Sequence, residues 1–165
     1  MICLIIVGVC DLTDGTVARS FTDRSEDERM FGIQIDSLSD ALGFVALPIA
    51  ISLGFGNNDA VSIAVCALYA IAGLVRLAYF NVLSAKSKVK VFTGLPVPAV
   101  VLVFPFLWLI AKYVDGFWIT VLFDVCMAIL AILFVSRIRI NKPSRTIQTV
   151  FAVLAAIGVI LILIL

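Results

Sequence analysis

Residues 1–20 read MICLIIVGVCDLTDGTVARS, an apolar run long enough to cross a membrane as a helix, with two aspartates in its second half. The rest of the chain is similarly apolar. Of its 165 residues, 63% are hydrophobic and only 14% are charged, and the mean hydropathy is +1.20. A soluble domain has about 25% charged residues. The composition therefore excludes a water-soluble fold and predicts an integral membrane protein.

Further apolar runs of similar length follow the first. Together the runs cover residues 1–20, 31–55, 60–84, 96–113, 116–135 and 147–165. Alternating ten-residue strands are absent, which argues against a membrane β-barrel. The sequence predicts an all-α fold, a polytopic transmembrane bundle of about six helices, in a single domain over residues 1–165.

Basic residues alternate between the connections. Lysine and arginine crowd the first, third and fifth connections, whereas the second has none and the fourth has only Lys112 beside it. Because loops rich in lysine and arginine stay in the cytoplasm, the odd-numbered connections are assigned to that side. The first run has no basic leader, so a cleaved signal peptide is not expected. Three acids of the first connection, Glu26, Asp27 and Glu28, are expected in a solvated loop.

Two features of the composition narrow the chemistry. The chain has no histidine, which excludes histidine-based triads and histidine zinc sites. Four cysteines lie inside apolar runs without CxxC spacing, and we interpret them as small core residues: Cys3, Cys10, Cys66 and Cys126. Acid–base chemistry must therefore use carboxylates, lysines or tyrosines.

Four aspartates lie inside the first two apolar runs, where charge is expensive. Asp11 and Asp14 are three residues apart, and Asp36 and Asp40 are four apart, so each pair shares one helix face. Counted from the connection between the runs, both pairs lie at a depth of about 10 Å. Four carboxylates at one depth would repel each other without cations between them. The spacing predicts a two-metal site for Mg²⁺ or Mn²⁺.

Small residues accompany these carboxylates. Gly15 and Ala18 share the face of Asp11, and Gly32 precedes Asp36 by one turn. They would let a bulky ligand approach the helix backbone, although ordinary close helix packing is the alternative explanation. Arg19 continues the same face toward water, where it could pair with phosphate oxygens.

The two segments DLTDGTVAR (11–19) and GIQIDSLSD (32–40) resemble the signature of the CDP-alcohol phosphatidyltransferase family, D-x2-D-G-x2-A-R…G-x3-D-x3-D. The family consists of membrane enzymes with a core of six helices. They use two divalent cations to move a phosphatidyl group from a CDP-linked lipid to an alcohol, releasing CMP. The resemblance implies that Asp11 and Asp36 bridge both metals, that Asp14 binds one, and that Asp40 binds the other and acts as general base. It implies CDP-lipid binding at Gly15, Ala18, Arg19 and Gly32.

Three later segments resemble bacterial and archaeal phosphatidylserine synthases: RLAYFN (76–81), FTGLPVPA (92–99) and VSRIR (135–139). The implied acceptor is L-serine and the implied donor CDP-diacylglycerol. Arg76 would receive the serine carboxylate or a substrate phosphate, and Asn81 would bind the same amino acid. Tyr79 departs from the usual arginine of that subfamily, so glycerol 3-phosphate, inositol phosphate and an archaeal CDP-archaeol substrate stay open. The GLPVP segment is expected to form a turn in which the prolines begin the next helix.

The resemblance has further implications. It places the site on the cytoplasmic side of a bacterial or archaeal membrane and implies a homodimer. It also implies that the family's first helix is missing upstream of Met1, which leaves an inactive truncated fragment as a non-enzyme alternative. A cation transporter lined by carboxylates is a weaker alternative, because the other side of the predicted bundle is nearly free of charge apart from Asp124. The sequence assigns no role to Asp124.

Overall fold

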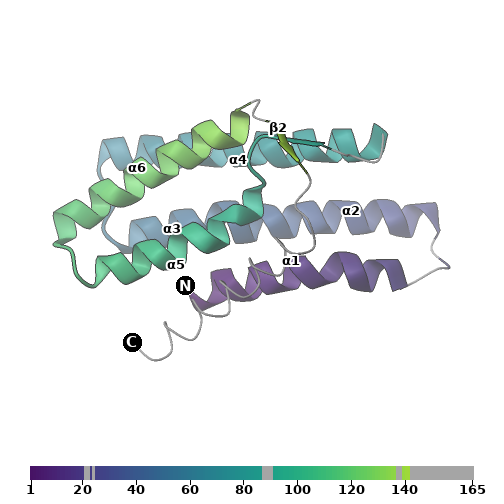
Figure 1. Cartoon of the computed structure of the whole chain (residues 1–165), viewed down its shortest axis with the longest axis horizontal. Coiled ribbons are helices and arrows are strands. Elements are labelled where there is room, and N and C mark those ends of the chain that lie inside the picture. The colour runs from purple at the N-terminus through teal and green to yellow at the C-terminus, as the bar shows by residue number, and fades with distance from the viewer. Residues whose placement is uncertain (21–22, 24, 87–90, 137–138, 142–165) are drawn as a thin grey trace.

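The computed structural model describes residues 1–20, 23, 25–86, 91–136 and 139–141, without the side chains of residues 15–16, 18–20, 84–86, 91–93 and 139–141. The helices lie along one long axis, and α1 runs beside α2 (Figure 1). The helical elements are α1 (Ile2–Ser20), α2 (Glu26–Asp40), the π-helical turn η1 (Ala41–Ala46), α3 (Leu47–Gly54), α4 (Ala60–Lys86), the 3₁₀ turn η2 (Val97–Ala99), α5 (Val100–Ala111) and α6 (Gly116–Val135).

The helices confirm a membrane bundle. Within the described residues, three helical stretches are long and apolar enough to cross a membrane: Glu26–Gly54, Ala60–Leu83 and Gly116–Val135. A shorter apolar stretch covers Val97–Ala111, and α1 occupies the first predicted run. The sixth predicted run, 147–165, lies outside the described residues, so the count of six crossings stays a prediction.

The second helix begins earlier than the sequence analysis predicts. Glu26, Asp27 and Glu28 form the first turn of α2 rather than a loop. The Ser25 hydroxyl accepts the backbone N–H of Glu28, and the Glu28 carboxylate accepts the backbone N–H of Ser25. This reciprocal capping box, with acids at the positive end of the helix dipole, explains the early start.

A small two-stranded sheet connects the segment before η2 and α5 with the segment after α6. The all-α prediction did not include this sheet. Strand β1 (Val91–Thr93) pairs antiparallel with β2 (Arg139–Asn141). Gly94 follows β1 with φ +82°, and a Cβ there would lie 2.8 Å from the Ser136 carbonyl oxygen. Only glycine fits this turn without strain. Pro96 occupies the N-cap position of η2, and α5 follows η2 directly. The expected turn is therefore confirmed.

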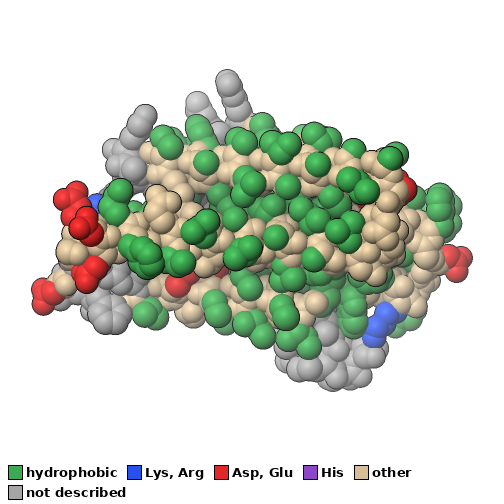
Figure 2. Space-filling view, turned by 180° about the vertical axis from the view of Figure 1, so that it is seen from behind, with side chains coloured by type: hydrophobic (Ala, Val, Ile, Leu, Met, Phe, Trp, Pro, Cys, Tyr) green, Lys and Arg blue, Asp and Glu red, His purple; other side chains and the backbone are tan. Residues whose placement is uncertain are grey.

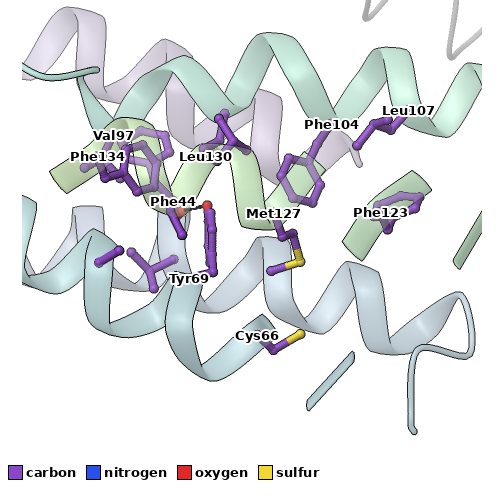
Figure 3. Packing of buried hydrophobic residues seen from close by; sticks show 14 of the residues in the cluster. Phe44, Cys66, Tyr69, Val97, Phe104, Leu107, Phe123, Met127, Leu130 and Phe134 are labelled. Carbon is purple, nitrogen blue, oxygen red and sulfur yellow. Dashed lines mark hydrogen bonds between the residues drawn. The ribbon is translucent and has the colours of Figure 1, made fainter. Parts of the chain in front are cut away.

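The core lies between α4, α5, α6 and η1. Its largest fully buried side chains are aromatic, and Tyr69, Phe44 and Phe104 are each 0% exposed (Figure 3). The outer surface is also apolar, as a lipid-facing surface must be. Hydrophobic side chains are spread along the whole length of the face in Figure 2, and acidic side chains gather mainly at its two ends.

The four cysteines are free thiols, but only part of the interpretation that placed them in the core is right. Cys66 is buried and Cys126 is half-buried. Cys3 and Cys10 are exposed on α1. A membrane helix can direct small apolar residues to lipid as well as to the core, so an apolar run alone does not distinguish the two faces.

Asp124 joins α6 to the connection between α3 and α4. Its Oδ1 accepts the Asn57 amide N–H at 2.8 Å, and its Oδ2 lies 2.6 Å from the Ser62 hydroxyl. The Ser62 hydroxyl also lies 2.8 Å from the carboxylate of Asp59, which caps the start of α4. Hydrogen bonds from Ser62 and Val61 lower the pKa of Asp59, with the Ser62 hydroxyl contributing most. Asp124 therefore links α6, the α3–α4 connection and the first turn of α4 by hydrogen bonds at one end of the bundle.

Asp124→Ala is expected to lower the free energy of unfolding by about 2 kcal/mol, because it removes a hydrogen-bond partner from both Asn57 and Ser62, which are buried. Thermal unfolding in detergent would measure the change. Asp115→Ala is the matched control, since Asp115 is exposed and its side chain caps nothing. Equal unfolding midpoints for the two variants would contradict this role.

Candidate metal centre

Carboxylates of α1 and α2 meet in the described structure. Asp11, Asp36 and Asp40 each offer an oxygen, and these three atoms lie within 4.8 Å of one another. Asp11 and Asp40 are half-buried, and Asp36 is exposed. The i, i+4 spacing places Asp36 and Asp40 on the face of α2 that meets α1, as the sequence predicts.

Asp14 lies at the edge of this group. Its side chain is exposed and is not one of the three mutually close carboxylates, although it lies near Asp36. Asp11 and Asp40 form the corresponding close pair. Each pair links α1 to α2. We call these four residues, Asp11, Asp14, Asp36 and Asp40, the aspartate cluster.

The aspartate cluster has the composition of a hard-cation site. Among the side chains that the structure describes, none of the four carboxylates forms a salt bridge with lysine or arginine. Opposite oxygens around one octahedral Mg²⁺ lie about 4.2 Å apart. The 4.8 Å spread of the three oxygens is close to that value, so a small inward movement would let one divalent ion contact all three. The donor set fits Mg²⁺ or Mn²⁺.

Among the described residues, the space beside Gly32 is open. A Cβ built on Gly32 would meet no atom within 4 Å among the described residues. Gly32 lies one turn before Asp36 on α2. Gly15, Ala18 and Arg19 lie on α1, but their side chains are outside the described part of the structure, so their proximity to the cluster stays a prediction.

Arg76 is buried against the turn before η2, with 5% of its surface exposed. Its Nε donates to the Leu95 carbonyl at 3.0 Å, and a terminal nitrogen donates to the Gly94 carbonyl at 3.2 Å. The guanidinium has five N–H donors in all. Arg76 therefore shapes the GLP turn, whatever part it has in binding substrate.

Asn81 contacts the helix that carries Asp36. Its amide nitrogen donates to the Ser37 hydroxyl at 2.6 Å, and that hydroxyl donates to the Ile33 carbonyl at 2.8 Å. Asn81 is thus a link between α4 and α2 beside the aspartate cluster. Arg76 and Asn81 are not in the cluster itself, and their partners in the described structure are protein groups.

Sequence reasoning missed the residues that shape the helix after Asp40. The π-helical turn η1 begins there, and Tyr69 of α4 donates its hydroxyl to the Phe44 carbonyl at 2.7 Å. Pro48, inside the second apolar run, was the available signal, because proline in a helix removes a backbone hydrogen bond.

Comparison with known sequences agrees with the aspartate cluster. The CDP-alcohol phosphatidyltransferase family profile matches residues 1–165. The chain belongs to the CDP-alcohol phosphatidyltransferase family. Enzymes of this family are generally dependent on divalent metal, and an acidic group suited to such ions is present here.

Relatives within the CDP-alcohol phosphatidyltransferase family carry names that specify serine. The chain is similar to CDP-diacylglycerol–serine O-phosphatidyltransferases of Saccharomyces cerevisiae (36% identical, covering 57% of this chain and 36% of the relative) and Methanocaldococcus jannaschii (31%, covering 92% and 70%). It is also similar to the archaetidylserine synthase of Methanothermobacter thermautotrophicus (35%, covering 84% and 56%). The chain thus spans about a third of the yeast relative's length.

Proposed function

We propose that this chain transfers a phosphatidyl group from CDP-diacylglycerol to the hydroxyl of L-serine, giving phosphatidylserine and CMP. The observation that carries the proposal is the meeting of Asp11, Asp36 and Asp40 between α1 and α2. The names of the relatives support serine as the acceptor.

The chain's own residues supply the acid–base chemistry in this proposal. Asp40 accepts the proton of the serine hydroxyl as its oxygen attacks the phosphorus that carries the glycerol lipid. The bond from this phosphorus to the bridging oxygen breaks, and that oxygen leaves with CMP. A placed general base contributes about 10²- to 10⁴-fold to such a step.

Asp11, Asp14, Asp36 and Asp40 would hold two divalent cations, Mg²⁺ or Mn²⁺. When bound, these cations neutralise the diphosphate and the charge that develops on the departing CMP. Gly15, Ala18 and Gly32 would leave room for the CDP group, and Arg19 would pair with phosphate.

The acceptor would enter beside α4. In this proposal Arg76 directs its guanidinium donors to the serine carboxylate, a charge-assisted pairing that suits a planar fork. Asn81 would lie next to the bound serine while it keeps its link to Ser37.

The site would face the cytoplasm. The connection between α1 and α2 and the C-terminal end of α4 lie at one end of the bundle, and the connections α3–α4 and α5–α6 lie at the other (Figure 1). In the sequence, the connections that follow α1 and α4 are rich in lysine and arginine, which supports the cytoplasmic assignment. Lipid tails could stay in the bilayer while the headgroup reaches the aspartate cluster.

An acceptor panel tests the proposal. Membranes containing the chain are supplied with Mn²⁺ and either CDP-diacylglycerol or CDP-archaeol, then with serine, glycerol 3-phosphate or inositol phosphate. Of the three acceptors, only serine is expected to cause CMP release. Comparing the two donors distinguishes a diacyl from an archaeal ether substrate. Release with glycerol 3-phosphate and none with serine would overturn the acceptor assignment.

A further inference from the structure

The helix that carries Asp36 and Asp40 changes its winding directly after Asp40. Residues Ala41–Ala46 form the π-helical turn η1, in which the Leu47 N–H donates to the carbonyl of Leu42, five residues earlier. Such a turn holds one more residue than an α-helical turn, so it rotates the preceding segment relative to the following one. The direction of Asp40 relative to α3 therefore depends on η1.

Pro48 explains why the α-helix cannot continue unchanged. In an α-helix the N–H of residue 48 would donate to the Phe44 carbonyl, but proline has no N–H and its ring crowds that carbonyl. Phe44 is 0% exposed, so an unpaired carbonyl there would be costly. The hydroxyl of Tyr69, also 0% exposed, donates to it at 2.7 Å (Figure 3).

The π-helical turn also contacts the two neighbouring helices. A Cβ on Gly43 would overlap the Val7 side chain of α1, one helical turn before Asp11. A Cβ on Gly73 of α4 would lie 2.8 Å from the Val45 side chain. Because η1 packs this closely against α1, a change in its winding would move Asp40 relative to Asp11.

We infer that Tyr69 is a positioning residue for the aspartate cluster, acting through the Phe44 carbonyl to hold the π-helical turn that aims Asp40 at Asp11. The Tyr69 hydroxyl bonds to the Phe44 carbonyl and not to a carboxylate of the cluster. The inference rests on the proposed function in one respect, namely that the cluster binds divalent cations.

Tyr69→Phe tests the inference, because it removes only the hydroxyl and keeps the ring. Mn²⁺ affinity is measured in detergent from the electron paramagnetic resonance signal of free Mn²⁺. Loss of a residue that supports metal ligands weakens metal binding by about 10- to 100-fold, and we expect a loss in that range. The kcat for transfer should fall, while KM for serine stays within about twofold, because Tyr69 does not contact the acceptor.

Phe134→Leu is the matched control. Phe134 packs against the Tyr69 ring, with centroids 5.7 Å apart, but takes no part in the hydrogen bond to Phe44. This variant is expected to lower the unfolding midpoint and to leave Mn²⁺ affinity unchanged. Wild-type Mn²⁺ affinity in Tyr69→Phe, or an equal loss in Phe134→Leu, would overturn the inference.

Pro48→Ala supplies a second test that needs no turnover. It gives residue 48 an N–H that can pair with the Phe44 carbonyl, so the penalty of Tyr69→Phe on the unfolding midpoint should be smaller in the Pro48→Ala background. An undiminished penalty there would overturn the inference. Because unfolding is measured without serine or CDP-lipid, failure of the proposed transfer reaction would leave this result standing.

Discussion

Asp40→Asn is expected to lower the rate of serine-dependent CMP release by about 10²- to 10⁴-fold. Asparagine has nearly the same shape as aspartate and keeps one oxygen that can contact a cation, but it cannot accept the proton of the serine hydroxyl. The loss should therefore lie mainly in kcat. Mn²⁺ affinity should fall as well, because Asp40 is one of the three carboxylates that would hold the ion, so the rates are compared at saturating Mn²⁺.

Asp27→Asn is the matched control for this experiment. It removes a carboxylate from the same helix, but from the first turn of α2, far along the helix from the aspartate cluster. Its activity should stay within about twofold of the wild type, because a surface charge contributes little. Asp40→Asn activity within tenfold of the control would show that another group accepts the proton.

Asp11→Asn is expected to weaken Mn²⁺ binding more than Asp14→Asn. Asp11 belongs to the three carboxylates within 4.8 Å of one another, whereas Asp14 is exposed and lies at the edge of the aspartate cluster, near Asp36. Asp11→Asn should weaken Mn²⁺ binding by more than about 100-fold. Removing a residue that only supports a metal ligand costs up to about that much, and Asp11 would be a direct ligand.

The same Mn²⁺ titration measures both variants, and turnover should fall in the same order. The pair is its own control, since each substitution removes one charge from the same helix, three residues apart. A larger loss for Asp14→Asn would contradict the geometry of the cluster. Equal affinity in both variants and the wild type would mean that the cluster does not bind the ion.

Much of the site could be predicted from sequence because helix periodicity fixes which residues share a face. The spacing of Asp36 and Asp40 was enough to place them together, and the structure brings Asp11 beside them. Each of the five predicted apolar runs that the structure describes contains a helix, and the GLPVP turn forms where the prolines indicated. The predicted start of α2 was wrong because the prediction overlooked the capping box of Ser25 and Glu28.

Contacts between distant segments could not be predicted in this way. The pairing of Asp124 with Asn57 and Ser62 depends on how α6 packs against the start of α4. Tyr69 reaches Phe44 across 25 residues, and periodicity gives no sign of that hydrogen bond. Arg76 was assigned to substrate, and only the fold shows that it also binds the carbonyls of Gly94 and Leu95.

The central claim is that the aspartate cluster performs metal-dependent phosphatidyl transfer to serine. Its most direct test is CMP release from CDP-diacylglycerol by membranes containing the chain, after treatment with a chelator and then with Mn²⁺ added back, in the presence and absence of serine. We expect release to stop on chelation and to return only when both Mn²⁺ and serine are present. Serine-dependent release that survives chelation would contradict the claim.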